Sequence, residues 1–233
     1  MALKDDLDSF VKKSFNENWE NRKGQVVPEP SDLKSSNEAI EFERATVLYA
    51  DISGSTSMVN SLAWHKSAEL YKNFLYCSAR LITDNGGTIT AYDGDRVMGV
   101  FVGDFQSTPA ARCALKINYA VSQIIMPAFQ TQYPNDTFKL RHTVGIDTSP
   151  IKVAKTGVRG DNDLVWIGRA ANYAAKLNEL SADYPTWITG DLYSRLQEDA
   201  KNNGNPIQHM WQKFTWSQMN NLEIYGSTWR WEI

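Results

Sequence analysis

Apolar side chains recur at a helical spacing over residues 2–21. They are Leu3, Leu7, Phe10, Val11, Phe15 and Trp19, and most of the positions between them are charged or polar. This spacing predicts an amphipathic helix that packs on the body of the protein or on a partner subunit, or that stands as a solvated arm. A glycine, two prolines and a stretch rich in Ser and Asn predict a linker over residues 24–37. We therefore expect residues 1–39 to form an N-terminal amphipathic helix and linker, and residues 40–233 to form one domain.

Beyond residue 40, short apolar runs rich in β-branched residues alternate with helical patterns. The predicted strands are 45–52, 88–92, 96–102, 140–147, 150–156 and 163–167, with edge strands at 187–189 and 222–233. The predicted helices are 57–83, 110–132 and 169–180, and Pro127 should kink or end the second of them. The order β-α-β-β-α-β, with additions, is typical of an α+β fold of the ferredoxin-like kind. That fold has an antiparallel sheet with helices on one face.

The bulk properties exclude several classes of protein. The chain has 233 residues, 42% of them hydrophobic and 22% charged, and its net charge is −3. This balance gives no electrostatic footprint for nucleic acid or for an anionic membrane. Charges interrupt every apolar run before about 18 residues, and the N-terminus lacks the apolar core of a signal peptide. We expect a cytoplasmic protein that binds neither nucleic acid nor membrane.

Two aspartates lie where strands end. Asp51 ends a predicted buried strand just before a Gly-Ser-Thr turn that opens a helix, and Asp95 lies at the tip of a glycine-containing hairpin. A carboxylate in such a place is a hard ligand for a divalent cation, and the amides of the turn can face phosphate oxygens. The second carboxylate could complete a site for two Mg²⁺ or Mn²⁺ ions. On spacing alone, the pattern favours a structural role, in which Asp51 is a capping residue and Asp93 and Asp95 are turn formers.

Four sequence blocks around these residues favour the metal-binding role over the structural one. They are ATVLYADISGSTSMVNSL (45–62), YDGDRVMGVF (92–101), VGIDTSPI (144–151) and VWIGRAANYAAKL (165–177). In this order they resemble the signatures of class III adenylate and guanylate cyclases, over residues 40 to about 200. The third block departs from the family's usual Val-Gly-Ile-His-Thr-Gly-Pro. Any one block is a weak signal, but their joint occurrence is a strong one.

The resemblance implies a metal-dependent nucleotide cyclase and assigns roles in the first two blocks. Asp51 and Asp95 fall on the family's two metal-binding aspartates, and Ile52 falls where a backbone carbonyl binds metal. The cofactors implied are two divalent ions, Mn²⁺ or Mg²⁺. The amides around Gly54, Ser55 and Thr56 would hold the triphosphate of a nucleotide.

The fourth block carries the implied catalytic pair. Asn172 falls on the residue that orients the ribose, and Lys176 falls on the family's arginine, which contacts the α-phosphate. Lysine keeps the charge and loses the bidentate fork. The two residues are four apart and share a helix face, and without the family they read as an exposed Asn and Lys beside a small-residue interface. Because the family takes this pair from one subunit and the aspartates from the other, the resemblance implies a homodimer with two shared sites.

The positions that choose a purine in the family carry apolar residues in this chain. Adenylate cyclases have a Lys and an Asp where this chain has Ala91 and Val165, and guanylate cyclases commonly have Glu and Cys there. Neither Ala91 nor Val165 can hydrogen-bond through its side chain. The chain could therefore be a degenerate cyclase that binds a nucleotide without turnover, or it could read a different base.

The retained aspartates and asparagine favour a different base. The first block, Arg44 before it and the Val-Trp-Ile-Gly run resemble the bacterial pyrimidine cyclases of the antiphage Pycsar system, which make cyclic UMP or cyclic CMP. Uracil offers two carbonyl acceptors, so a donor such as Arg44 or the Tyr49 hydroxyl would favour UTP over CTP. Two structural alternatives stay open, in which Arg44 is a surface charge and Tyr49 a core aromatic. We expect UTP as substrate and CTP as the alternative.

Overall fold

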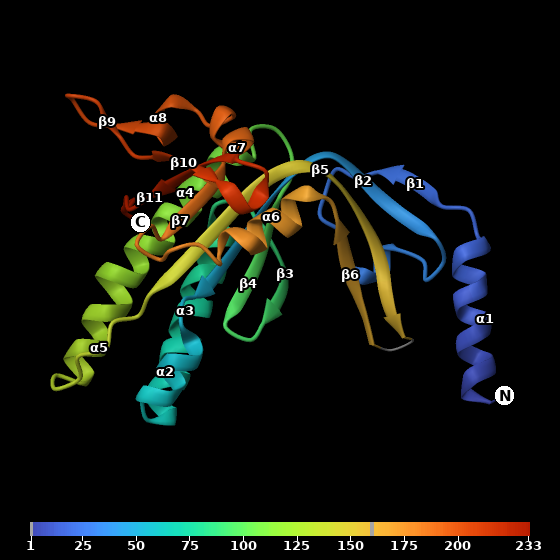
Figure 1. Cartoon of the computed structure of the whole chain (residues 1–233), viewed down its shortest axis with the longest axis horizontal. Coiled ribbons are helices and arrows are strands. Elements are labelled where there is room, and N and C mark those ends of the chain that lie inside the picture. The colour runs from blue at the N-terminus through green and yellow to red at the C-terminus, as the bar shows by residue number, and fades with distance from the viewer. Residues whose placement is uncertain (1, 159–160) are drawn as a thin grey trace.

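A mixed sheet forms the centre of the protein (Figure 1). The computed structural model describes residues 2–158 and 161–233. The strands of the sheet are β1 (Glu20–Lys23), β2 (Glu38–Ile52), β3 (Thr88–Asp93), β4 (Arg96–Phe101), β5 (His142–Val158), β6 (Asp161–Ile167), β7 (Thr186–Thr189), β10 (Gln212–Trp216) and β11 (Leu222–Ser227). Their order is β10-β11-β7-β5-β2-β4-β3, with β1 paired to β2 and β6 paired to β5. A separate small pair joins β8 (Asn202–Asn203) and β9 (Gln208–His209).

The helices of the described residues follow the predicted order. They are α1 (Leu3–Asn16), α2 (Ser55–Ser61), α3 (Trp64–Asp84), α4 (Ser107–Tyr119), α5 (Met126–Gln132), α6 (Arg169–Leu177), α7 (Gly190–Ser194) and α8 (Glu198–Lys201). The α+β fold predicted from the sequence is confirmed. Most strand pairs are antiparallel as expected, and the pairs β1–β2 and β5–β7 are parallel.

β2 and β5 make the middle of the sheet because both are long and apolar. They pair antiparallel from Ala39 opposite Ala154 to Ile52 opposite His142. A β-bulge between Phe42 and Ala45 interrupts this register. The C-terminal end of β2 therefore lies between β4 and β5, which hold it on both sides through backbone hydrogen bonds.

Helices cover both faces of this sheet, which corrects the expectation of helices on one face. Alternate side chains of β2 point to opposite faces. Leu48, Ala50 and Ile52 join a core with Phe74 of α3 and Ala114 of α4. On the other face, Val47 and Tyr49 pack with the alanines of α6. The small side chains of α6 let it lie flat on a face that the larger helices α3 and α4 leave free.

Three further expectations about individual elements differ from the structure. The predicted helix 110–132 continues past Pro127, because a π-helical turn (Ala120–Ile125) precedes α5 and places the proline in its first turn, where its missing N–H costs little. The predicted strands 140–147 and 150–156 form one strand, β5. The predicted edge strands 187–189 and 222–233 correspond to β7 and β11, and both lie inside the sheet. β7 lies between β5 and β11, and β11 lies between β7 and β10, which takes the edge.

The N-terminal segment forms the predicted helix, α1, at one end of the molecule's long axis (Figure 1). α1 buries none of its residues, and its apolar side chains are exposed. The side chain of Asn37 donates hydrogen bonds to the carbonyls of Ser14 and Glu17 and so fixes the end of the helix. Of the helices in the described part of the chain, none combines the length and apolar character that a membrane crossing requires.

A buried histidine in β5 makes the stability of this core sensitive to acid. His142 is 3% exposed, its ring packs 5.8 Å from that of Phe74, and its Nε2 has no hydrogen-bond partner among the described residues. Burial lowers the pKa of His142 from its ordinary 6.5 to about 4. Between these two pH values the unfolded chain binds the proton more tightly than the folded chain, so the free energy of unfolding falls as the pH drops through this window.

We expect His142→Leu to remove part of this acid sensitivity. The wild type should lose about 2 kcal/mol more stability than the variant between about pH 7 and pH 5. Urea unfolding at the two pH values measures this difference. His65→Gln, which changes an exposed histidine, is the matched control and should behave like the wild type. Equal pH dependence in His142→Leu and the wild type would contradict the prediction.

Candidate active site

The first candidate residue, Asp51, lies at the end of the buried strand β2. It pairs in register with Arg96 on β4 and Thr143 on β5. The chain then turns through Gly54, whose φ of +73° lies in the left-handed region that favours glycine, and α2 begins at Ser55. The backbone N–H of Ser53 donates to the carbonyl of Arg141 at 2.9 Å. This strand-turn-helix unit thus holds Asp51 and the Gly54–Thr56 amides next to one another.

The second candidate, Asp95, lies in the tight turn between β3 and β4, where Gly94 also has a positive φ. Asp51 and Asp95 are close enough to interact. Burial and, to a smaller extent, the negative charge of Asp95 together raise the pKa of Asp51 to about 6. Two carboxylates that repel one another in a half-buried place form a site that a cation would stabilise.

The chemistry of this donor set fits a substrate-bound hard cation. Among the described residues, no group of three or more His, Cys, Asp or Glu side chains is placed to hold a metal ion. Mg²⁺ is commonly bound through one or two carboxylates, with water and substrate phosphates as its other ligands, whereas a structural metal needs a full protein cage. Asp51, Asp95 and the Ile52 carbonyl supply such a partial set.

Arg96 is a further candidate residue, which was not predicted from the sequence. Its guanidinium donates to Asp93 and lies 5.3 Å from the ring centre of Tyr49. Its charge lowers the pKa of Asp51, opposing the effects of burial and Asp95. The position directly after Asp95 in the second block was the available signal. Tyr49 lies on the same face of β2 as Asp51, and burial raises the pKa of its hydroxyl.

Asn172 and Lys176 lie on the exposed face of α6, on the second face of the sheet. Both side chains are exposed. Among the described residues, the Asn172 amide has no side-chain hydrogen bond, and the only hydrogen-bond partner of Lys176 Nζ is Met219 Sδ at 3.9 Å. Two polar groups one helical turn apart are therefore free to contact a further molecule.

One chain does not bring this pair to the aspartates. A cavity of about 620 Å³ is lined by Asp51, Ile52 and Gly54 and also by the segment 178–183 that follows α6. Neither Asn172 nor Lys176 lines it. Each chain thus presents two separate groups of candidate residues.

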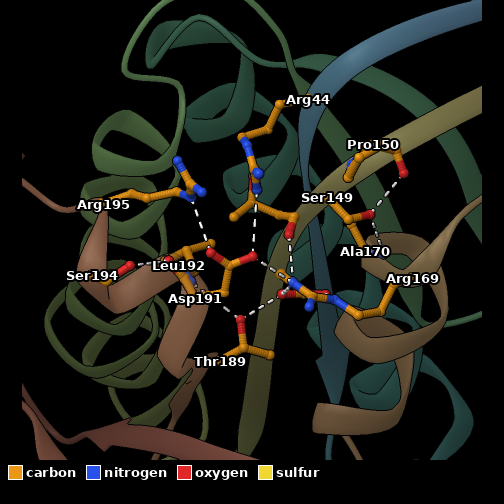
Figure 2. A network of polar contacts seen from close by, with 12 residues as sticks. Arg44, Ser149, Pro150, Arg169, Ala170, Thr189, Asp191, Leu192, Ser194 and Arg195 are labelled. Atoms are coloured by element: carbon orange, nitrogen blue, oxygen red, sulfur yellow. Dashed lines mark hydrogen bonds and ion pairs between the residues drawn. The ribbon is translucent and has the colours of Figure 1, made fainter.

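The four base-reading candidates also separate. Ala91 packs in the same cluster as Tyr49. Val165 is 42% exposed and lines another cavity with Phe10 and Trp19 of the N-terminal segment. Arg44 lies seven residues before Asp51 on β2, roughly 20 Å along a strand. Its guanidinium is 3.4 Å from Asp191 (Figure 2). Within one chain, only Tyr49 and Ala91 lie together near the acidic pair.

Comparison with known proteins shows the family to which this chain belongs. No protein-family model matches the chain. It is 51% identical over 234 residues to a uridylate cyclase from Xanthomonas perforans and 53% identical over 234 residues to one from Burkholderia cepacia. Both alignments cover 100% of this chain and 100% of the relative.

A solved structure shows the same fold at lower identity. The adenylyl cyclase CyaB from P. aeruginosa has a TM-score of 0.66 and 22% identity to this chain, and the match covers 82% of this chain and 95% of that one. The shared fold agrees with the resemblance of the four sequence blocks. Given the 51% and 53% identity over the whole length of two relatives, the chain belongs to the uridylate cyclase family of class III nucleotidyl cyclases.

Proposed function

We propose that this chain converts UTP to 3′,5′-cyclic UMP and pyrophosphate, as a homodimer with two equivalent shared sites. The observation that carries the proposal is the separation of the two candidate groups within one chain. Asp51 lines one cavity and interacts electrostatically with Asp95, and Asn172 and Lys176 stand exposed elsewhere. In a two-fold dimer, the acidic pair of each subunit would face Asn172 and Lys176 of the other subunit. This arrangement makes two equivalent sites.

The proposed reaction is an internal phosphoryl transfer. The ribose 3′-oxygen forms a bond to the α-phosphorus, and the bond from the α-phosphorus to the oxygen that bridges to the β-phosphate breaks. Pyrophosphate leaves with that oxygen, and the 3′-hydroxyl proton passes to solvent. Such a reaction asks the protein for positioning and charge stabilisation rather than for covalent chemistry.

The chain's own residues divide this work. Asp51, Asp95 and the Ile52 carbonyl would hold two Mg²⁺ or Mn²⁺ ions, which when bound favour the ionised 3′-hydroxyl and neutralise the phosphates. The backbone N–H groups at the start of α2, from Gly54 to Thr56, would donate to the triphosphate. Asn172 would hold the ribose, and Lys176 would place a positive charge at the α-phosphate, as a point charge rather than a fork.

Uracil recognition is assigned to donors near the acidic pair. The Tyr49 hydroxyl and the neighbouring Arg96 guanidinium are both hydrogen-bond donors, and uracil presents carbonyl oxygens at O2 and O4. Cytosine has an amino group in place of the O4 acceptor and would lose such a bond. Arg44 remains a further candidate only if its interaction with Asp191 is exchanged for one with the base. Ala91 and Val165 would leave space without adding a polar contact.

The role of the product is part of the same proposal. The resemblance to the antiphage pyrimidine cyclases supports cyclic UMP as a second messenger in antiviral defence. Nucleotide extracts of bacteria that carry the chain should contain more cyclic UMP after phage infection than before it. An unchanged level would contradict this role without affecting the proposed reaction.

Incubation with each of the four nucleoside triphosphates in the presence of Mn²⁺ tests the reaction directly. Mass identification of the products should find cyclic UMP from UTP, with turnover of CTP, ATP and GTP at least about tenfold lower, as expected for a pocket that loses a hydrogen bond with the wrong base. Cyclic CMP as the main product would overturn the base assignment. Absence of pyrophosphate release from all four would overturn the enzymatic function and favour a nucleotide-binding module.

A further inference from the structure

The face of helix α6 that packs on the sheet consists mainly of small side chains. Its buried residues are Ala170, Ala171, Ala174 and Leu177. At Gly145 of β5 the helix backbone comes so close that an added Cβ would lie 2.1 Å from the carbonyl oxygen of Ala174. Alanine side chains offer few ridges to interlock with the strands below. The packing face therefore leaves the position of α6 along its axis weakly fixed.

An arginine anchors the start of this helix, together with the Ala170 N–H, which donates to Ser149 Oγ at 3.0 Å. Arg169 is the first residue of α6, and its Nε and Nη2 donate to the two carboxylate oxygens of Asp147 at 2.9 and 3.1 Å. Nη2 also lies 2.7 Å from the carbonyl oxygen of Thr148 and 2.8 Å from Oδ2 of Asp191. Figure 2 shows this guanidinium between β5 and α7. The first turn of α6 is thus bonded to two other elements.

Asp147, the main partner of Arg169, is a fully buried carboxylate. It is 0% exposed and also accepts a hydrogen bond of 2.5 Å from the Thr189 hydroxyl. Burial raises its pKa, and the hydrogen bonds from Thr189 and Arg169 oppose that shift. A buried ion pair gives little net stability compared with apolar packing, but its bidentate geometry fixes orientation. The pair is therefore better explained by a need for position than by a need for stability.

Asp191, the second partner, extends the network to two more arginines. It accepts from Arg195, the residue that follows α7, at 3.1 Å and contacts Arg44 at 3.4 Å. Arg195 and Arg169 both donate to the Asp191 carboxylate. Among the described residues, Arg195 itself makes no hydrogen bond to α6. The chain thus contains a matched control, since removing Arg195 disturbs the network and leaves the bonds of α6 in place.

We infer that Arg169 is a positioning residue, which holds α6 through Asp147 and Asp191 so that Asn172 and Lys176 meet the substrate in register. Asn172 follows Arg169 by three residues and Lys176 follows it by seven, so both lie on the turns just after the fixed one. The inference rests on the proposed function, in which these two side chains face the substrate. A shift of about 1 Å at such groups can cost about 10²-fold in rate.

Steady-state kinetics with UTP and Mn²⁺ test this role. Arg169→Lys keeps the charge opposite Asp147 and loses the fork, and it should lower kcat at least about tenfold with KM changed less than about threefold. Asp191→Asn, which leaves the Asp147 pair intact, should give a smaller loss of the same kind. Arg195→Gln should stay within about twofold of the wild type. If Arg169 acts through Asn172, Arg169→Lys should cost less than about threefold in an Asn172→Ala background.

Hydrogen exchange of the α6 amides supplies a readout that does not need activity. The amides of residues 170–177 should exchange faster in Arg169→Lys than in the wild type, and Arg195→Gln should not change them. Unchanged exchange, a kcat within twofold of the wild type, or the same cost in the Asn172→Ala background would each overturn the inference. If the wild type turns over no triphosphate, the proposed function fails, and the exchange rates still decide whether Arg169 holds α6.

Discussion

Asp51→Asn is expected to lower cyclase turnover by about 10³-fold or more while the chain stays folded. The substitution removes one of two carboxylates that would hold the metal ions, and the loss of several kcal/mol of transition-state stabilisation corresponds to this factor. Pyrophosphate release from UTP measures it. Asp104→Asn, at an exposed loop position after β4, is the matched control and should keep wild-type turnover. Activity retained in Asp51→Asn would rule out the metal assignment.

The same variant should be more stable than the wild type when no metal is present. Burial and the charge of Asp95 raise the pKa of Asp51 from 3.8 to about 6. The folded chain therefore binds a proton more tightly than the unfolded chain, and the free energy of unfolding falls as the pH rises through this window. Near neutral pH the ionised carboxylate is destabilising, and Asp51→Asn removes it.

Thermal unfolding in a chelating buffer should show this as a rise in Tm of a few degrees. Added Mn²⁺ should then raise the Tm of the wild type, because an ion that binds only the folded chain stabilises it, and should leave Asp51→Asn nearly unchanged. A Tm below that of the wild type in chelator would contradict the electrostatic account. A Mn²⁺ response equal to the wild type's would contradict the site.

Lys176→Ala is expected to lower kcat by about 10²-fold, with a smaller effect on KM. The ammonium group would act where charge develops at the α-phosphate, and removal of one such group typically costs 10²–10³-fold, or about 3–4 kcal/mol. Lys176→Arg introduces the arginine that class III cyclases usually have at this position. The variant should keep most of the wild-type activity or exceed it. Lys152→Ala, which removes a lysine of β5 that forms an ion pair with Glu41 of β2, is the control. If Lys176→Ala instead raised KM by about 10²-fold and left kcat unchanged, Lys176 would only bind substrate.

Local sequence signals were sufficient to predict the elements that carry the candidate residues. The apolar run before Asp51, the glycine turns at Gly54 and Gly94, and the helical spacing of Asn172 and Lys176 each depend on a few neighbouring residues. The structure places these residues at a strand end, in a tight turn and on an exposed helix face. Such features follow from local backbone preferences and period, which a sequence states directly.

Features that depend on distant residues could not be predicted in this way. The face of the sheet that α6 covers is set by competition with α3 and α4 for space. The network around Arg169 joins residues from β2, β5, α6 and α7, and no local pattern links Asp147 with Asp191. The sequence offers Arg44 as a candidate donor for the base or as a surface charge, and its contact with Asp191 appears only when these segments meet. The interior position of β11 likewise depends on β10, a strand that the sequence pattern did not indicate.

Mixing the two inactive variants tests the central claim, that each active site is shared between two subunits. Asp51→Asn and Lys176→Ala would each lack one half of both sites as homodimers. Refolded together in equal amounts, half of the dimers should be mixed, and each mixed dimer should have one intact site. The account predicts recovery of about one quarter of wild-type turnover. Turnover of the mixture no higher than the average of the separate variants would contradict it.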